Sequence, residues 1–503
     1  MIPILLCLVF GVLSLLLLVL FIRENFGTKK APPGPFRFPL VGSLIQIAMI
    51  HPTQPYVAFS KMREKYGDIM TIKLGSVDAV VFNSGDVMEE YLTKTEFSDR
   101  YCNAWMQERT FHKQLGIIFG KYPDPWQEMR RFSIRTLRDF GYGKRNKMLS
   151  VIHDELTDIV YELKTSINEN NGIHNFDSCY FTISTLNVLW SMLAGVRYEH
   201  RDPKLLRILK VMQEMMESCN FGNSFLLAYP QWKDWFPNWT GMTLQRNCFK
   251  EMNGFCQEFI EERRKLGIYK TEPENVVDEF LAEIDAHQHD SDTPYTDQQL
   301  IAIMNDLFMT GSESTSQTLG WCILYLIHNP KVQEKLQAEI DSVVPKGTFP
   351  VPEHESQLHY VRATLAETHR LGSVAPLLGP RVAGTDTFCG SYFIRKGTYI
   401  IANMHGVFRD KKHWKDPENF RPERFLDNGG NFKNDNWLKP FGFGKRACLG
   451  EPLASMNLLY YVTILLQNFS FFPAPNESMP STEPVVGVTN GHQPFRALIK
   501  CRS

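Results

Sequence analysis

The sequence predicts a mainly α-helical protein with a small β portion, in which one globular domain follows an N-terminal membrane anchor. Residues 2–22 carry no charged side chain, helical periodicity dominates residues 125–345, and the strand-like segments outside that region are short. The chain has 503 residues, 43% of them hydrophobic, which is enough for a large core. Since no repeat or low-complexity linker interrupts residues 37–503, we expect a single domain there.

The first expected element is the apolar segment IPILLCLVFGVLSLLLLVLFI, which is long enough to cross a bilayer as one helix. Three cations follow it, which favours a cytoplasmic position for the rest of the chain. A cleaved signal peptide is the alternative, although no cleavage site is clear. We therefore expect an anchor over residues 1–22, a basic, proline-rich hinge over residues 23–36 and a domain over residues 37–503.

Short strands are expected at three places. Residues 68–84 read as a hairpin around Gly75, residues 386–403 contain strand-like pieces with a Lys-Gly turn, and the tail FRALIKCRS forms a last strand. The remaining elements are helices. The longest begins at Thr296, which has Gln299 three residues later in a capping-box pattern, and ends before Pro330.

Composition argues against several classes of protein. The formal net charge is −1, so no overall positive field suggests a nucleic-acid partner. The ten cysteines include no CxxC pair, which weighs against a zinc ribbon and against a secreted disulfide scaffold. Most of these thiols are expected to be reduced and buried.

One cysteine stands in an unusual segment, FGFGKRACLG, over residues 441–450. Its glycines permit tight turns and a close approach of a flat ligand to the backbone. An apolar helix follows, so Cys448 precedes a helix N-terminus, whose partial charge favours a thiolate, and Arg446 is nearby. The pattern indicates a thiolate ligand for a trivalent metal ion. The alternative is an ordinary core cysteine in a glycine-rich loop.

This segment resembles the haem-binding loop of the cytochromes P-450, the haem-thiolate monooxygenases. The resemblance implies the cytochrome P-450 fold, with haem b held between a long distal helix and the proximal cysteine loop with its following helix. It implies that Cys448 binds the iron and that Phe441 and Gly450 contact the haem. It extends from the anchor to the end of the chain.

Two further patterns support the resemblance. The segment ETHR supplies Glu367 and Arg370, and RPERF supplies Arg424. In the family these three residues form a buried ion network that supports the cysteine loop, so we assign them a structural role. Haem also carries two propionates, for which arginines are suitable partners. The resemblance implies Trp126, Arg130, Arg446, Arg381 and Arg100 for this task.

The long helix resembles the distal helix of the family. The resemblance implies that Gly311 lets the helix bulge to make room for dioxygen, and that Glu313 and Ser314 relay protons, with Thr315 beside them. The family usually has threonine where this chain has Ser314, and alanine or glycine where it has Thr310. Serine keeps the hydroxyl but loses the methyl group that restricts its rotamers. These departures put the coupling efficiency in doubt, not the haem.

The implied activity is insertion of one oxygen atom of dioxygen into a lipophilic substrate, by hydroxylation or epoxidation. Electrons derived from NADPH would come from a partner flavoprotein, NADPH-cytochrome P-450 reductase, and cytochrome b5 is a further partner. Arg131, Arg135 and Arg138 are the implied docking face, although a solvated basic helix surface is equally consistent with them. Two alternatives are a reductase-independent haem-thiolate isomerase or dehydratase, and a haem-binding carrier or sensor.

The substrate side is expected to be apolar. The resemblance places six residues at the pocket walls: Met304, Phe308, Ala375, Leu377, Leu378 and Thr489. Since these include no lysine or arginine, a clamp for a carboxylate is not expected. The aromatic segment over residues 221–239 suggests contact with a bilayer, and packing in the core is the alternative. The motif spellings resemble animal microsomal members of the second clan, and arthropod ones in part, which implies a steroid or terpenoid hormone or a xenobiotic as substrate and the endoplasmic reticulum membrane as location.

Overall fold

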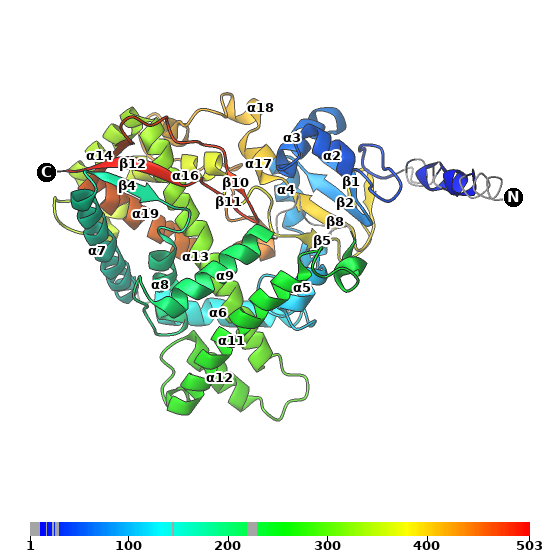
Figure 1. The fold of residues 1–503 in the computed structure, drawn as a ribbon, viewed down its shortest axis with the longest axis horizontal. Helices are drawn as coiled ribbons and strands as arrows, with labels where there is room; N and C mark the ends of the chain where they lie inside the picture. Colours follow the sequence, from blue (N-terminus) through cyan, green and yellow to red (C-terminus); the bar gives the residue numbers. More distant parts are fainter. Residues whose placement is uncertain are drawn as a thin grey trace.

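The computed structural model describes residues 11–16, 18–22, 25, 30–142, 145–218 and 229–502. Helices form most of the molecule, and a smaller β region packs beside them near the N-terminal end of the chain (Figure 1). The sequence prediction of a mainly helical chain with a small β portion is confirmed.

Helices occur along most of the described chain and dominate its middle, as the sequence predicts. The α-helices are α2 (Leu44–Ile50), α3 (Pro55–Tyr66), α4 (Gly85–Leu92), α5 (Ala104–Arg109), α6 (Trp126–Leu137), α7 (Arg145–Glu169), α8 (Thr182–Leu193), α9 (Pro203–Ser218), α11 (Met242–Leu266), α12 (Val276–Ala286), α13 (Asp297–His328), α14 (Pro330–Val343), α15 (Pro352–Glu355), α16 (His359–Gly372), α17 (Met404–Phe408), α18 (Lys411–Trp414) and α19 (Glu451–Asn468). Short turns of 3-10 helix include η6 (Pro422–Phe425).

Within the described residues, the strands form four small sheets. Five strands pair in the order β1-β2-β8-β5-β3, three in the order β4-β12-β9, and two pairs are β6-β7 and β10-β11. Their bounds are β1 (Ile69–Leu74), β2 (Val77–Phe82), β3 (Asp99–Arg100), β4 (Ile173–Phe176), β5 (Arg381–Val382), β6 (Thr387–Cys389), β7 (Tyr392–Ile394), β8 (Tyr399–Ala402), β9 (Phe469–Pro473), β10 (Val485–Val486), β11 (Asn490–Gly491) and β12 (Phe495–Cys501).

The three expected β segments are present. β1 and β2 form the predicted hairpin, and the tail forms β12, which pairs with both β4 and β9. The strands on either side of the Lys-Gly turn do not pair with each other. β7 pairs with β6, whereas β8 lies parallel to β2 in the larger sheet.

α13 is the longest helix and begins where the capping pattern predicts. The Thr296 hydroxyl accepts a hydrogen bond from the Gln299 backbone N–H over 3.2 Å. The Gln299 side chain instead accepts a bond from the Gly116 backbone N–H, so only half of the capping box forms. At 1.5 Å per residue, its 32 residues span about 48 Å.

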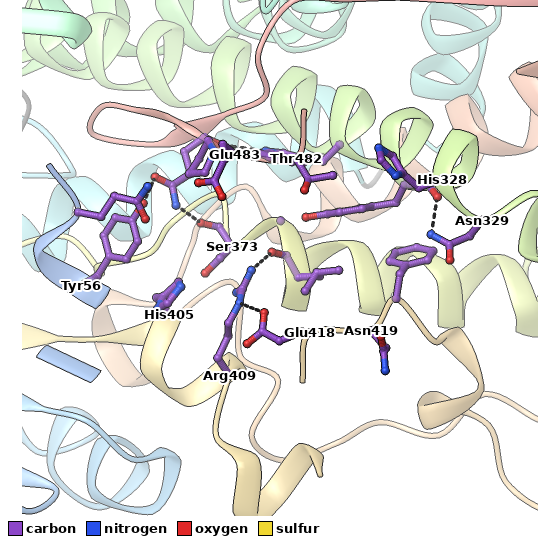
Figure 2. A pocket seen from close by; sticks show the side chains of 18 residues that line it. Tyr56, His328, Asn329, Ser373, His405, Arg409, Glu418, Asn419, Thr482 and Glu483 are labelled. Atoms are coloured by element: carbon purple, nitrogen blue, oxygen red, sulfur yellow. Dashed lines mark hydrogen bonds and ion pairs between the residues drawn. The ribbon is translucent and has the colours of Figure 1, made fainter. Parts of the chain in front are cut away.

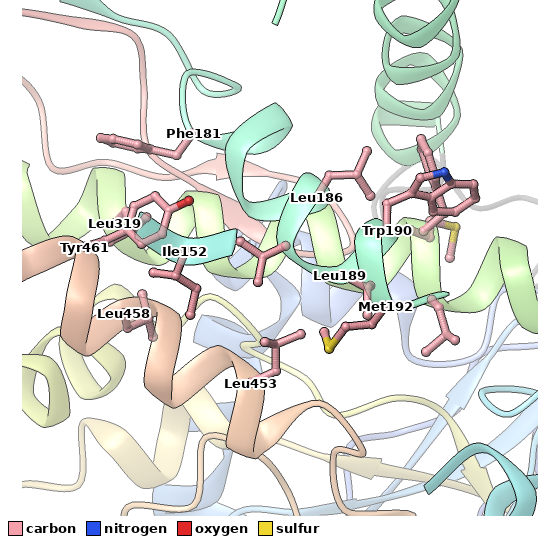
Figure 3. Close-up of a cluster of buried hydrophobic side chains, with 14 of the residues drawn as sticks. Ile152, Phe181, Leu186, Leu189, Trp190, Met192, Leu319, Leu453, Leu458 and Tyr461 are labelled. Atoms are coloured by element: carbon pink, nitrogen blue, oxygen red, sulfur yellow. The ribbon is translucent and has the colours of Figure 1, made fainter. Parts of the chain in front are cut away.

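The largest core packs α7, α8 and α19 against α13 (Figure 3). Trp190 of α8 is fully buried and makes an edge-to-face contact with Phe308 of α13, with ring centres 5.3 Å apart. Apolar side chains from the same four helices, among them Leu189 and Leu453, belong to this buried cluster (Figure 3). This packing fixes the rotation of α13 about its axis, and thereby the face that it presents to the site.

Much of the expected anchor, residues 1–10 and 17, lies outside the described residues, as do 23, 24 and 26–29 of the hinge. In the part of the chain that the structure describes, we find no helix long and apolar enough to span a bilayer.

Candidate functional site

A cavity of about 560 Å³ lies inside the helical body. The middle of α13 lines one side, the loop of Cys448 lines another, and the turn between β10 and β11 completes the wall. Fifteen of the predicted site residues line this cavity: Arg100, Arg130, Gly311, Glu313, Ser314, Thr315, Ala375, Leu377, Leu378, Arg381, Phe441, Arg446, Cys448, Gly450 and Thr489. The fold therefore gathers most of the predicted site around one space.

The loop of residues 441–450 carries Cys448 to the cavity. The Cys448 backbone N–H donates to the Phe441 carbonyl oxygen over 2.8 Å, which closes the loop. Gly444 has a φ of +60°, and a Cβ there would lie 2.8 Å from the Leu92 carbonyl oxygen, so the turn requires glycine. α19 begins directly after the loop, as the sequence predicts.

Opposing effects act on the Cys448 thiol. Burial raises its pKa, the backbone N–H groups of Gly450 and Glu451 and the guanidinium of Arg130 lower it, and the net pKa is raised. The start of α19 thus favours the thiolate as the sequence predicts, although Arg130 and not Arg446 is the guanidinium that contributes. The side chain is exposed to the cavity, and the surrounding protein supplies the desolvation that opposes the thiolate. A cation bound directly to the sulfur would reverse that balance.

Two of the predicted arginines are brought together by strand pairing. β3 and β5 are antiparallel, with Arg100 directly opposite Arg381. The Arg100 Nε donates to the Ile118 carbonyl oxygen over 2.8 Å, and the Arg381 Nη2 donates to the Phe443 carbonyl oxygen over 2.7 Å. Backbone carbonyls thus hold both guanidinium groups at the edge of the cavity.

Trp126 does not line the cavity but lies against Arg446. The Arg446 guanidinium carbon is 3.8 Å from the centre of the Trp126 ring, and the indole N–H donates to the Ile117 carbonyl oxygen over 2.7 Å. Arg446 itself donates to the carbonyl oxygens of Ser98 and Gly120 over 2.8 and 2.7 Å. The indole therefore supports Arg446 from outside the cavity, and a direct contact of Trp126 with the ligand stays a prediction.

The four arginines form an unusually cationic wall. Burial lowers the pKa of Arg446 to about 8, that of Arg381 to about 9 and that of Arg100 to about 10, and their mutual repulsion adds to the effect. Burial also lowers the pKa of Arg130, whose Nη2 donates to the Ala447 carbonyl oxygen over 2.8 Å. In the described part of the chain these guanidinium groups bond to backbone carbonyls and to no carboxylate. Such a wall fits a ligand that brings its own carboxylates.

The three residues of the predicted ion network are in contact. The Arg370 Nε and Nη2 donate to the two oxygens of Glu367 over 2.7 and 2.8 Å, and the Arg424 Nε donates to Glu367 over 3.0 Å. Arg370 also donates to the carbonyl oxygens of Phe408 and Pro417. The network thus fastens the segment after α17 to α16, and its support of the cysteine loop stays a prediction because these bonds do not reach that loop.

The hydroxyl groups in the middle of α13 are bonded to their own helix. The Ser314 Oγ donates to the Thr310 carbonyl oxygen over 3.0 Å, and Ser312 and Thr318 make the same bond to the residue four positions earlier. These bonds explain how a polar cluster is accommodated within a buried helix. Thr315 is buried beside them and lines the cavity.

Gly311 does not produce the expected bulge, since α13 is a continuous α-helix through this position. Its neighbour is Leu189 of α8, and a Cβ at position 311 would overlap the Leu189 Cδ2. Glycine here serves the close approach of α8 to α13, which is a packing requirement that the motif alone does not reveal.

Glu313 contacts the opposite wall. Its Oε1 accepts a hydrogen bond from the Thr489 hydroxyl over 2.6 Å, across the cavity from the turn between β10 and β11. Thr489 was predicted only as a pocket wall. The two residues are 176 positions apart, so no local pattern could indicate the bond.

Two predicted pocket residues are wrong. Met304 and Phe308 are buried in the core between helices and do not line the cavity. Leu307, Thr310 and Ser314 line it instead, which is the i, i+3, i+7 stripe of α13. For Phe308 the error is one residue, or about 100° of helix rotation, whereas Met304 lies before the part of α13 that lines the cavity.

Sequence reasoning missed a buried ion pair at the cavity. Asp306 of α13 lines the cavity, forms an ion pair with Arg109 of α5, and accepts bonds from the backbone N–H groups of Ile117 and Ile118 over 2.5 and 2.9 Å. Asp306 and Arg109 are 1% and 2% exposed. The cavity wall thus includes a buried carboxylate that was not predicted, and its charge is neutralised by Arg109.

The predicted basic face lies at the surface around α6. Arg131 is exposed, Arg135 forms an ion pair with Glu283 over 3.3 Å, and Arg138 contacts Asp139 over 3.3 Å. Arg138 follows the last residue of α6 and begins a π-helical turn, so the three side chains do not continue one straight helical stripe.

A second cavity, of about 490 Å³, lies beyond the C-terminal end of α16. Figure 2 shows its wall, where Arg409 bonds to Glu418 and to the Leu371 carbonyl oxygen of α16, with Ser373 and Tyr56 nearby. Asn490, the residue after Thr489, lines this second cavity. The hairpin turn thus separates the two spaces.

The comparisons with known proteins agree with this geometry. The model of the Cytochrome P450 family matches residues 32–499. Farnesoate epoxidase of Bombyx mori is 31% identical over 477 residues, which cover 94% of both chains. Cytochrome P450 2J3 of Rattus norvegicus is 33% identical over 90% of this chain and 88% of its own, and cytochrome P450 2J2 of Homo sapiens is 32% identical over 94% and 91%. With Cys448 presented to an arginine-lined cavity opposite the acid and hydroxyls of α13, the chain belongs to the cytochrome P450 family and is a monooxygenase that uses haem iron, dioxygen and electrons from a redox partner.

Proposed function

We propose that the chain is a membrane-bound haem-thiolate monooxygenase that takes NADPH-derived electrons from NADPH-cytochrome P-450 reductase. The observation that carries the proposal is the placement of Cys448 in one cavity with the middle of α13 and four arginines without carboxylate partners in the described chain. Haem b would bind through Cys448, with its propionates toward Arg100, Arg130, Arg381 and Arg446. When bound, it supplies the activation of dioxygen.

The chain's own residues then do two things. Leu307, Ala375, Leu377 and Leu378 exclude water and orient a lipophilic substrate. Glu313 and its neighbouring hydroxyl at Ser314 move protons from the solvent side toward the reacting oxygen. For this transfer the Ser314 hydroxyl must turn from the Thr310 carbonyl oxygen, which a serine side chain does readily.

We infer the substrate class, the redox partner and the location from three further observations. The name of the silkworm relative, farnesoate epoxidase, makes a terpenoid the first substrate class to test, followed by steroids and xenobiotics. The exposed basic residues Arg131, Arg135 and Arg138 are the proposed docking face for the reductase or cytochrome b5. Trp235, Phe236 and Trp239 are 73%, 52% and 61% exposed, which favours contact with the endoplasmic reticulum membrane over packing in the core. Residues 219–228 of the same aromatic segment lie outside the described residues.

The first experiment is the carbon monoxide difference spectrum of the reduced protein in membranes, for wild type and Cys448→Ser. A strongly red-shifted Soret band that disappears in Cys448→Ser is expected. Consumption of NADPH with added reductase then separates a monooxygenase from a reductase-independent isomerase or a haem carrier, neither of which needs those electrons. A retained thiolate band in Cys448→Ser contradicts the assignment of the ligand.

A further inference from the structure

The hairpin of β10 and β11 brings one hydroxyl to the acid of α13. Thr489, in the turn between the strands, donates from its Oγ1 to the Glu313 Oε1 over 2.6 Å, and both residues line the cavity of Cys448. The Gly487 backbone N–H donates to the Thr489 carbonyl oxygen over 3.1 Å, which closes the turn. A short bond from a hydroxyl to a carboxylate is charge-assisted, so it selects one rotamer of the acid.

The turn is held from behind by Asn490, which is 2% exposed. Its backbone N–H donates to the Val374 carbonyl oxygen over 2.8 Å, and its own carbonyl oxygen accepts from the Trp321 indole over 3.1 Å. Its side chain accepts from the Tyr56 hydroxyl over 3.1 Å and donates to the Ser373 carbonyl oxygen over 3.3 Å. Contacts from α3, α13 and the end of α16 therefore fix this residue.

Thr489 is the last residue of the turn, and Asn490 is the first residue of β11. Thr489 faces the cavity of Cys448, whereas Asn490 lines the second cavity, whose wall includes Tyr56 and Ser373 (Figure 2). The position of the Thr489 hydroxyl is consequently set by packing on the far side of the turn. The bond to Glu313 is therefore preorganised by the fold.

We propose that Thr489 is a positioning residue for Glu313, and that the yield of product per NADPH consumed depends on its hydroxyl. This inference rests on the proposed monooxygenase function. Without the hydroxyl, the carboxylate adopts other rotamers and protons arrive through water instead of through Glu313 and Ser314. Electrons are then lost to free hydrogen peroxide.

The test compares Thr489→Val, Thr489→Ser and wild type in the complete system with reductase and a lipophilic substrate that gives a spin-state shift. Peroxide released per NADPH is expected to rise roughly ten-fold in Thr489→Val, which is the size of effect that loss of one hydrogen bond to a charged group produces. In Thr489→Ser, which keeps the hydroxyl, it is expected to stay within about two-fold of wild type. Peroxide and NADPH are compared at saturating substrate for each variant, so a change of substrate affinity at this wall residue does not enter the ratio. Thr482→Val is the matched control, because Thr482 lies before the same hairpin and lines the second cavity.

A double mutant isolates the pair. In a Glu313→Gln background, Thr489→Val is expected to add nothing to peroxide release, because the group that it positions has been removed. Unchanged coupling in Thr489→Val, equal uncoupling in Thr489→Ser, or additive effects with Glu313→Gln would each overturn the proposal. Should Thr489→Val lose the thiolate band, Thr489→Ala serves as the second variant with the same expectations. Absence of that band in wild type refutes the proposed function itself, whereas a normal band with unchanged coupling refutes only the role of Thr489.

Discussion

The Arg446 guanidinium carbon lies 3.8 Å from the centre of the Trp126 ring, so a residue of the cysteine loop is held by a residue of α6. The ring is 2% exposed and its N–H is bonded to the Ile117 carbonyl oxygen. The face of the Trp126 ring therefore lies against the Arg446 guanidinium, which bonds to no carboxylate within the described chain. The ring supplies the electrostatic attraction that a carboxylate would otherwise give.

Replacement of Trp126 by leucine is expected to weaken haem retention. It removes a desolvated cation–π contact worth on the order of 2 kcal/mol and leaves a void beside Arg446. The ratio of bound haem to protein after gel filtration measures the effect. Trp235→Leu changes an exposed tryptophan and should retain haem as wild type does. Equal retention by both variants would contradict a supporting role for Trp126.

Replacement of Glu367 by glutamine is expected to prevent accumulation of folded holoprotein. It leaves Arg370, which is fully buried, and Arg424 without their shared carboxylate, at a cost of about 3–5 kcal/mol. The amount of protein with a thiolate carbon monoxide band measures the loss. As a control, Glu90→Gln removes an exposed partner of Lys94 and should cost less than about 1 kcal/mol. Normal expression of Glu367→Gln would rule out a structural role for the network.

Replacement of Asp306 by asparagine is expected to lower stability by about 3–5 kcal/mol, because Arg109 then keeps a buried charge without its partner. The double variant Arg109→Leu, Asp306→Asn should recover part of that loss. Urea unfolding followed by tryptophan fluorescence gives the midpoints. Asp297→Asn, in the exposed first turn of the same helix, is the matched control. If the double variant were less stable than Asp306→Asn, the loss of stability in Asp306→Asn would not come from the unpaired charge of Arg109.

Replacement of Ser314 by alanine is expected to raise peroxide release per NADPH by about ten-fold, within the usual contribution of a positioned proton donor. Ser314→Thr should couple at least as well as wild type, since the added methyl group restricts the hydroxyl. Peroxide and NADPH assays with reductase provide the measurement, and Ser342→Ala on exposed α14 is the control. Unchanged coupling in Ser314→Ala removes this residue from the proton route.

Stability should also depend on pH through His200. Hydrogen bonds with Glu155 and Glu162 raise the pKa of His200 to about 9, above its ordinary value of 6.5. The folded chain therefore binds more protons than the unfolded chain between these values, so the stabilisation is complete below pH 6.5 and is lost as the pH rises through 9. At pH 6 the urea midpoint of wild type should be higher than that of His200→Gln. At pH 9.5 the midpoints of the two proteins should be nearly equal. His289→Gln, at an exposed position, should show no such convergence.

Residues in local motifs could be predicted from the sequence, because the chemistry there depends on neighbours within a few positions. Cys448, Glu367 and Glu313 each lie in a short motif, and the structure puts Cys448 and Glu313 on the same cavity and Glu367 in the expected network. The start of α13 at Thr296 likewise follows from one capping side chain. For the same reason the main strands were predicted from alternation and turns.

Contacts between distant segments could not be predicted in this way. The pairs Arg109–Asp306 and Thr489–Glu313 join residues 197 and 176 positions apart. Even where one partner lies in a motif, as Glu313 does, its own segment does not indicate the other partner. The rotation of α13 is set by packing on α8, so Phe308 was placed on the wrong face by about 100°. The thiol of Cys448 shows the same limit, because desolvation depends on the whole surrounding fold.

The close approach of Leu189 to Gly311 has an evolutionary consequence. Since a Cβ at position 311 would overlap the Cδ2 atom of Leu189, alanine there requires that side chain to turn, and Leu189 lines the cavity. Relatives with alanine at the position of Gly311 should therefore carry a smaller residue, or a different leucine rotamer, at that of Leu189. Variation at this helix crossing is thus expected to change the shape of the cavity wall.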